Sequence, residues 1–301
     1  MNGVLIVDKP AGLTSHDVVN RVRRFLGQKS VGHLGTLDPM ATGVLPLVAG
    51  NLTRLAQFYT SSEKQYEGTI RFGFATDTYD AEGETVGTPQ TITVDLDRIR
   101  EVALKFVGEI EQMPPPFSAK KIQGVPAYKL ARKKKDVPLS AVKVDIKALE
   151  ILDCAGDCAH FRAHVGSGTY MRSIAHDMGR ELGCGAHLAS LRRTQVADFS
   201  LADAHTFEEV ADIGQRGDWD ALFLHPRKLL TQMPAVTATD EMAARIRSGR
   251  SVNLPDFSAA KQVKVFQGQR ELIAIATRIA GTLFHPGIVF AAETHSHALK
   301  S

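Results

Sequence analysis

The chain has 301 residues, of which 44% are hydrophobic and 23% charged, and this fits one large globular domain or a large and a small one. No apolar stretch approaches the length of a membrane span, and the first residues lack the basic flank and cleavage site of a signal peptide. Three cysteines exclude a disulfide framework and favour a reducing, cytoplasmic location.

The basic residues are unevenly distributed, although the net charge is only +3. Seven of them, with no acidic residue between them, lie within residues 120–135: Lys120, Lys121, Lys129, Arg132, Lys133, Lys134 and Lys135. The rest of the chain is therefore slightly acidic. One concentrated basic segment predicts a polyanionic partner bound at a defined place. A solvated helix face would carry the same charge, and charge alone does not separate the two.

The first part of the chain shows strand and helix patterns separated by a glycine-rich loop. Residues 3–7 form an apolar run that predicts a strand, and Ser15 is expected to cap a helix that ends at Gly27. From residue 66 to residue 74 apolar and polar residues alternate as in a strand with one buried face.

The middle of the chain predicts a helix, a pair of strands and a second helix. Residues 96–107 have helical spacing, and residues 142–152 and 160–165 look like two strands joined by a tight turn. A helix follows Gly166-Ser167-Gly168-Thr169 and ends at Gly183. Residues 188–196 are expected to form a short strand or turn.

The character of the sequence changes near residue 225. Thr239 is expected to cap a helix, and three short strands follow at residues 263–266, 272–279 and 288–290. This β-rich unit is too small to be very stable alone.

Asp38 is the first candidate for chemistry. It lies in Gly35-Thr36-Leu37-Asp38-Pro39-Met40-Ala41-Thr42-Gly43, where glycines permit sharp turns and close approach of a ligand. Pro39 restricts Asp38 to an extended conformation, so that the loop presents one carboxylate on a rigid platform. Read alone, the same segment also fits an ordinary Asp-Pro turn.

Four other residues could cooperate with this carboxylate. Arg172, near the start of the helix after Thr169, could keep a nucleophilic carboxylate ionised, because a guanidinium lowers the pKa of its partner. Tyr66 and Tyr170 could stack on a base flipped out of a nucleic acid, and His33 between two glycines could fill the space that the base leaves. A surface ion pair, core packing and a loop histidine are the ordinary alternatives.

A second cluster contains Cys154, Cys158, His160 and His164. Strand spacing would place the two histidines far apart, and the pattern matches no standard zinc module, so we expect no metal site here. No phosphate-binding loop or dinucleotide fingerprint follows a predicted strand.

Eight stretches together carry a resemblance to a known family. They are Val7-Asp8-Lys9-Pro10-Ala11-Gly12-Leu13-Thr14-Ser15, Gly32-His33-Leu34-Gly35-Thr36-Leu37-Asp38-Pro39-Met40-Ala41-Thr42-Gly43-Val44-Leu45-Pro46, Lys64-Gln65-Tyr66-Glu67, Thr76-Asp77-Thr78-Tyr79-Asp80-Ala81-Glu82-Gly83, Pro114-Pro115-Pro116-Phe117-Ser118-Ala119-Lys120-Lys121, Tyr128-Lys129-Leu130-Ala131-Arg132, Gly168-Thr169-Tyr170-Met171-Arg172-Ser173-Ile174 and Leu188-Ala189-Ser190-Leu191-Arg192-Arg193-Thr194. In this order they resemble the TruB family of tRNA pseudouridine synthases. The sequence departs from the family where Lys133-Lys134-Lys135 replaces a position that is commonly glycine.

The resemblance implies an α+β fold. Its catalytic domain, residues 1–228, would be a mixed β-sheet flanked by helices, with a thumb-like RNA-binding insertion at about residues 112–140. A small β-rich, PUA-like RNA-binding domain would follow at residues 229–292, and residues 293–301 would be a disordered tail.

The resemblance also implies a reaction, the conversion of the uridine at position 55 in the T-loop of tRNA to pseudouridine. Carried over by position, Asp38 is the nucleophile, Arg172 pairs with it, Tyr66 stacks on the target base and is a candidate for proton transfer, Tyr170 and Leu191 line the pocket, and His33 takes the vacated place in the T-loop. Whether Asp38 attacks C1′ or C6, or assists proton removal from the sugar, stays open.

The expected partner is the T-arm of tRNA, with no membrane and no obligatory protein partner, and we expect a monomer. The isomerisation involves neither redox change nor hydrolysis, so no cofactor is expected. Two alternatives remain: a related stand-alone or guide-dependent synthase acting on another RNA, and an RNA-binding tRNA folding factor with secondary catalysis.

Overall fold

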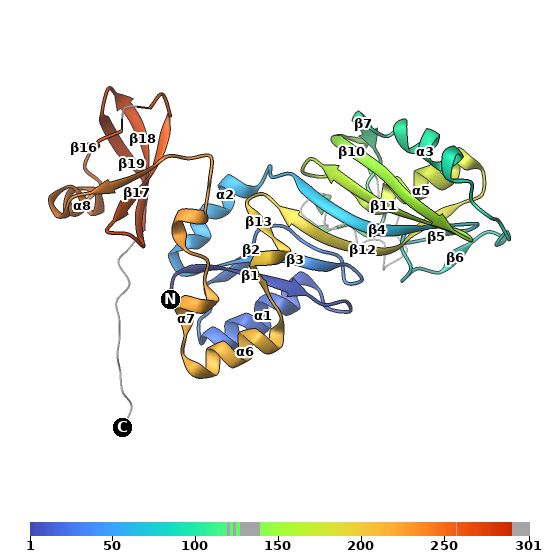
Figure 1. Cartoon of the computed structure of the whole chain (residues 1–301), viewed down its shortest axis with the longest axis horizontal. Helices are drawn as coiled ribbons and strands as arrows, with labels where there is room; N and C mark the ends of the chain where they lie inside the picture. The colour runs from blue at the N-terminus through green and yellow to red at the C-terminus, as the bar shows by residue number, and fades with distance from the viewer. Residues whose placement is uncertain (119–120, 123–124, 127–138, 257, 291–301) are drawn as a thin grey trace.

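A computed structural model describes residues 1–118, 121–122, 125–126, 139–256 and 258–290 (Figure 1). The largest described sheet has ten strands, in the order β14-β1-β3-β12-β4-β11-β10-β7, with β2 paired to β3 and β13 paired to β12. Its strands are β1 (Gly3–Lys9), β2 (Val31–His33), β3 (Thr42–Ala49), β4 (Lys64–Phe72), β7 (Gly108–Gln112), β10 (Val142–Ala155), β11 (Cys158–Val165), β12 (Ala186–Val196), β13 (Phe199–Ser200) and β14 (Ala204–His205). The pairs β1–β14 and β3–β12 are parallel and the others antiparallel, which confirms a mixed sheet.

Helices cover one face of this sheet. They are α1 (Ser15–Leu26), α3 (Leu96–Leu104), α5 (Met171–Leu182) and α6 (Phe207–Arg216). Val18 of α1 and Ile174 of α5 belong to the same buried apolar cluster as Leu5 and Val7 of β1. The helices are amphipathic, and burial of their apolar stripes against the sheet stabilises both layers.

The opposite face of the sheet is divided. Val4 and Ile6, which alternate with Leu5 and Val7 along β1, pack in a second cluster that also contains Tyr59 and Phe266. Tyr59 comes from the short helix α2 (Ala56–Tyr59), and Phe266 from the C-terminal sheet. The two sheets therefore share a core at this end, which lies at the left of Figure 1.

The C-terminal unit is a five-stranded sheet in the order β15-β17-β18-β19-β16. Its elements are β15 (Ala235–Ala238), α8 (Asp240–Arg247), β16 (Val252–Asn253), β17 (Gln262–Gln267), β18 (Glu271–Ala280) and β19 (Leu283–Val289). The predicted β-rich unit is confirmed, and Thr239 caps α8 as expected. The sequence pattern missed β15 and β16, because strands of two to four residues are too short for a clear alternation.

Short elements complete the described fold. They are the helix α7 (Trp219–Leu222), the 3₁₀ turns Gly50–Leu55, Leu201–Asp203 and Pro226–Lys228, and the two-stranded ribbons β5 (Ala75–Thr76) with β6 (Thr85–Val86) and β8 (Lys121–Ile122) with β9 (Val125–Pro126). None of the helices in the described part of the chain is long and apolar enough to span a bilayer.

One local prediction was wrong, and another gave the right kind of element but underestimated its length. Thr14, not Ser15, caps α1, and it forms a reciprocal capping box with Asp17. The segment expected to be a short strand or turn is β12, an 11-residue strand in the middle of the sheet. Its two consecutive arginines hid it, because a central strand normally reads as a continuous apolar run.

Candidate active site

Asp38 lies on the loop between β2 and β3, and three buried polar side chains fix that loop around it. Lys9, at the end of β1, is fully buried and donates from Nζ to the carbonyl oxygens of Pro10, Pro39 and Ala41 at 2.9, 3.1 and 2.6 Å. Burial lowers the pKa of Lys9 to about 8, and the nearby Asp38 carboxylate opposes that change. The ammonium therefore ties the end of β1 to the residues that follow Asp38.

Ser15 holds the residue before Asp38. Its Oγ accepts a hydrogen bond from the Leu37 amide at 2.8 Å and donates to the Leu37 carbonyl at 3.0 Å. The residue expected to be a helix cap is thus a buried brace, which satisfies both backbone groups of Leu37.

Arg193 of β12 holds both ends of the loop. It is 0% exposed, and its guanidinium donates to the carbonyl oxygens of Gly35, Thr36 and Val44 at 3.1, 3.2 and 2.8 Å. The backbones also meet closely here: Gly43 has φ +100°, and a Cβ at that position would lie 2.2 Å from the Arg193 carbonyl oxygen. Only glycine fits such an approach.

Arg172 stands between two carboxylates. It is the second residue of α5, and its Nε lies 2.9 Å from Oδ2 of Asp38 while Nη1 lies 3.3 Å from Oδ2 of Asp80. The guanidinium also donates to the carbonyl oxygens of Thr78 and Phe117 at 3.2 and 3.0 Å. Arg172 and Asp80 are both 5% exposed at their side chains, whereas Asp38 is 34% exposed, so the nucleophile candidate is the accessible member of the group.

Burial and the neighbouring charges act in opposite directions on the pKa of Asp38. Burial raises the pKa of the Asp38 carboxyl above its usual value, and Arg172 acts in the opposite direction without reversing the shift. Asp80 adds a further upward contribution to that pKa, because a second carboxylate disfavours the charged form of the first. The predicted ion pair is present, and Arg172 acts to lower the pKa of Asp38 as expected, although burial keeps that pKa above its usual value.

The Asp38 carboxylate opens into a pocket of about 240 Å³. Its lining is Thr36, Leu37, Asp38, Lys64, Tyr66, Gly168, Thr169, Tyr170, Met171, Arg172 and Leu191. The structure thus brings together Asp38, Tyr66, Tyr170, Arg172 and Leu191, which are five of the residues expected at the site.

The two tyrosines of the pocket are held differently. Tyr66 is buried on β4, where burial raises the pKa of its hydroxyl and the neighbouring Arg193 guanidinium opposes that effect. Tyr170 is half-buried, and Gln112 at the end of β7 braces its backbone, accepting from the Tyr170 amide at 2.8 Å and donating to its carbonyl at 3.1 Å. Burial also raises the pKa of the Tyr170 hydroxyl. Both phenols are therefore neutral at physiological pH.

His33 is not among the residues that line this pocket. It is half-buried at the end of β2, and its Nδ1 accepts a hydrogen bond from the Gly35 amide at 3.3 Å. Burial lowers the pKa of His33, and Arg193 and His16 lower it further, so the ring is neutral at physiological pH.

Most of the basic segment at residues 120–135 lies outside the described part of the chain. Lys120, Lys129, Arg132, Lys133, Lys134 and Lys135 lie outside the described residues. For Lys121 the backbone alone is described, in β8, which pairs with β9.

Four residues that fix the site were not singled out from the sequence: Lys9, Asp80, Gln112 and Arg193. Each is a buried polar side chain paired with a backbone group or a distant residue. No local pattern marks Arg193, because polar and apolar residues are mixed along β12.

The two histidines of β11 pair with different carboxylates. His160 Nδ1 lies 2.6 Å from Asp153, and His164 Nε2 lies 2.7 Å from Glu63. Within the described ranges, no group of three or more His, Cys, Asp or Glu side chains is placed to hold a metal ion.

Two family profiles match adjoining parts of the chain. Residues 23–171 match the profile of the TruB family pseudouridylate synthase N-terminal domain, and residues 172–230 match that of the tRNA pseudouridylate synthase B C-terminal domain. A protein of Solibacter usitatus named tRNA pseudouridine synthase B is 46% identical, over 96% of this chain and 100% of that protein. One of the same name from Aquifex aeolicus is 39% identical, over 90% and 93%.

Solved structures show the same fold. A chain in the crystal structure of a Cbf5-Nop10-Gar1 complex is 27% identical and superposes with a TM-score of 0.68, over 97% of this chain and 84% of that one. A chain in an H/ACA ribonucleoprotein bound to a substrate RNA containing 2′-deoxyuridine has a TM-score of 0.71 at 24% identity, over 96% and 85%.

Proposed function

Because this chain belongs to the TruB family of tRNA pseudouridine synthases, we propose that it isomerises the uridine at position 55 in the T-loop of tRNA, with Asp38 as the nucleophile. One observation supports this most directly. An accessible carboxylate, paired with a buried guanidinium, faces a small pocket that also contains two neutral tyrosines. At about 240 Å³ the pocket is below the ~300–1,000 Å³ of drug-sized ligand sites, which suits one flipped base.

The reaction exchanges one bond to the sugar for another. The bond from C1′ to N1 breaks, the base turns within the pocket, and a bond from C1′ to C5 forms, while C5 loses a proton and N1 gains one. Nothing is added or removed overall. The carboxylate of Asp38 can attack C1′ or C6, or it can accept a proton from the sugar. The buried Tyr66 ring provides a stacking surface for the base.

Arg172 has two effects on this step. It favours the ionised form of Asp38 against the effect of burial, and its contacts with Asp80, Thr78 and Phe117 fix the direction from which the guanidinium meets that carboxylate. Closure of the small pocket around the base excludes water, which would otherwise trap a cleaved sugar.

Binding of the RNA around this pocket would involve two further features. The neutral, glycine-flanked His33 is the candidate to occupy the place of the flipped base, and the basic residues of segment 120–135 are the candidate clamp on the phosphates. Relatives named tRNA pseudouridine synthase B match over 96% and 90% of this chain, which favours a stand-alone tRNA enzyme over a guide-dependent one. We expect a monomer.

An assay on unmodified tRNA transcripts tests the proposal. The wild-type protein should form pseudouridine in a transcript with uridine at position 55 and none in one with cytidine there. Asp38→Asn should form no product yet bind the transcript with unchanged affinity, while Asp97→Asn, at an exposed helix position, should behave as wild type. Product at another position, or full activity of Asp38→Asn, would overturn the assignment.

A further inference from the structure

A second cavity lies on the opposite side of the main sheet from the Asp38 pocket. Its volume is about 670 Å³, well above the 240 Å³ of the catalytic pocket. The residues that line it come from α2 and the segment after it, from the ends of β11 and β12, from the linker at 230–234 and from residues 260–262 before and at the start of β17. Cavities of this size between two structural units are common ligand sites.

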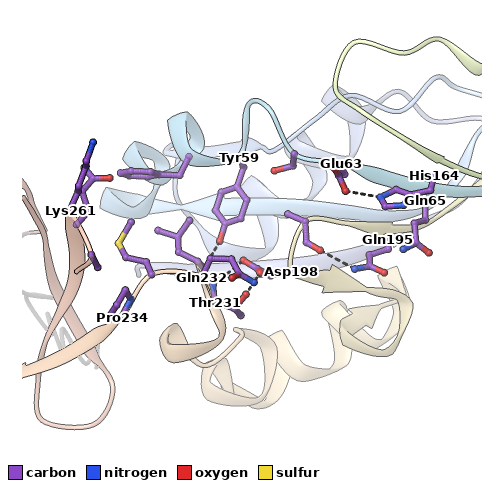
Figure 2. Close-up of a pocket in the computed structure, with 17 residues that line it drawn as sticks. Tyr59, Glu63, Gln65, His164, Gln195, Asp198, Thr231, Gln232, Pro234 and Lys261 are labelled. Carbon is purple, nitrogen blue, oxygen red and sulfur yellow. Dashed lines mark hydrogen bonds and ion pairs between the residues drawn. The ribbon is translucent and has the colours of Figure 1, made fainter. Parts of the chain in front are cut away.

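One strand separates the two cavities. Lys64 and Tyr66 of β4 line the catalytic pocket, and Gln65 between them lines the second cavity, because successive residues of a strand point to opposite faces. Gln65 is paired in register with His164 of β11 and with Gln195 of β12. These three side chains form a row at one end of the cavity, with Lys261 at the other end (Figure 2).

Hydrogen bonds fix the wall between these ends. The Tyr59 hydroxyl accepts from the Leu230 amide at 3.0 Å, and Asp198 accepts from both the amide and the hydroxyl of Thr231 (Figure 2). Burial raises the pKa of the Tyr59 hydroxyl, against the opposing effect of the hydrogen bond from the Leu230 amide, and the nearby Asp198 carboxylate raises it further, so the hydroxyl stays neutral. The linker that closes the cavity is thus pinned to the catalytic sheet, and the cavity is preformed.

The cavity presents unused amide groups. Within the described residues, the side-chain amides of Gln65 and Gln232 have no hydrogen-bond partner, and Gln195 uses only its Nε2, which donates to the Ala197 carbonyl. Half-buried Phe58 and Met233 supply apolar surface beside them. Glutamine amides offer a donor and an acceptor together, which matches the edge of a nucleobase, and apolar walls match its faces.

The charges of the lining argue against other ligands. Glu63 pairs with His164, and Asp198 is engaged by Thr231. Two carboxylates would repel an isolated phosphate or other small anion, and the described residues contain no cluster able to hold a metal ion. Lys261 is exposed and has no acidic partner in the described part of the chain, so it can meet a phosphate of an RNA backbone whose base lies deeper in the cavity.

We propose that this cavity binds an unpaired nucleotide of the RNA substrate, with its base on the amides of Gln65, Gln195 and Gln232 and its backbone toward Lys261. The proposal rests on the family's action on tRNA and not on which uridine is modified. The RNA would then contact the protein in both cavities, which lie on opposite sides of the sheet at the same end of β4.

Paired substitutions measure the contribution of the amides. Gln65→Leu and Gln232→Leu keep side-chain size and remove hydrogen bonding, and Gln57→Leu, on α2 outside the cavity, is the matched control. The double variant should raise the Kd for full-length tRNA about tenfold, as expected for two lost hydrogen bonds, while single-turnover pseudouridine formation at saturating enzyme and the melting temperature stay unchanged. An unchanged Kd in the double variant would overturn the proposal.

A cross-linking experiment identifies the occupant. With a photoreactive benzoylphenylalanine in place of Met233, we expect a cross-link to one unpaired nucleotide of tRNA that is lost in the Gln65→Leu, Gln232→Leu background. Cross-links to paired nucleotides only, or no cross-link, would count against an unpaired base in the cavity. Binding of free uridine monophosphate or adenosine monophosphate in the cavity that tRNA does not displace would also count against it. Because wild-type modification is mapped separately, failure here leaves the assignment of the catalytic pocket intact.

Discussion

Oδ2 of Asp80 lies 3.3 Å from Nη1 of Arg172, and both side chains are almost completely buried. Asp80 is itself held, since its Oδ1 accepts from the Thr78 hydroxyl at 2.6 Å and from the Glu82 amide at 3.1 Å. The guanidinium therefore has a fixed anionic partner besides the accessible Asp38. Asp80 positions Arg172, and through it Asp38, without lining the pocket.

Asp80→Asn should weaken this positioning. We expect kcat to fall about tenfold or more, equivalent to a loss of about 1.4 kcal/mol of transition-state stabilisation, with the Kd for tRNA unchanged. Asp77→Asn, at an exposed site in the same turn, is the control. A wild-type kcat in Asp80→Asn would show that Arg172 needs no second carboxylate.

Ser15 and Thr14 are neighbours with separable roles. Ser15→Ala leaves the Leu37 amide and carbonyl without partners, which costs about 1–3 kcal/mol for a buried group, and it should lower kcat because Leu37 precedes Asp38. Thr14→Ala removes the cap of α1, which costs about 1 kcal/mol, and should leave kcat unchanged. Urea unfolding and steady-state kinetics on both variants measure this contrast. Equal kcat values in the two would contradict it.

Arg193→Lys tests whether the hydrogen bonds from β12 fix the loop that carries Asp38. The substitution keeps the charge, but an ammonium cannot reproduce three hydrogen bonds from a planar guanidinium to Gly35, Thr36 and Val44. We expect kcat to fall and the melting temperature to drop, with KM little changed. Arg192→Lys, which alters the partly exposed pair with Asp8, should have a small effect on both. A larger loss of kcat and of melting temperature in Arg192→Lys than in Arg193→Lys would rule out this role for Arg193.

The pH dependence of kcat/KM should report Asp38. Its pKa lies above the ordinary value of 3.8, so activity should be lost on the acid side as the pH falls through this raised pKa and the carboxylate becomes protonated. In Asp80→Asn the acid limb should move to lower pH, because the Asp80 carboxylate contributes to the upward shift in the pKa of Asp38. A shift to higher pH in that variant would show that lost positioning of Arg172 outweighs the removed charge.

The basic segment gives a prediction from sequence alone. Replacing Lys133, Lys134 and Lys135 with Ala should weaken tRNA binding and reduce the slope of log K against log salt by up to about 2–3, since each phosphate contact contributes about 0.7–0.9. Filter binding over a range of salt concentrations measures the slope. If it stays at the wild-type value, these lysines do not contact the RNA.

Local chemistry made part of this site predictable. The glycines and Pro39 around Asp38, the start of α5 at Arg172 and the alternation that aims Tyr66 inward are all properties of short segments. The residues that hold the site in place depend instead on contacts between segments distant in the sequence. Lys9 and Arg193 are charged residues that sequence patterns place at the surface, and they are buried because distant loop carbonyls solvate them. Asp80 meets Arg172 only through the tertiary fold.

The alternation of side chains along β4 limits which sequence changes this strand can accept. Lys64 and Tyr66 face one cavity and Gln65 the other, so alternate positions of the strand serve different cavities. Inserting or deleting one residue there would turn the tyrosine away from Asp38 and bring the glutamine into its place. Length changes are therefore confined to the connection before Lys64, and within the strand only substitution is available.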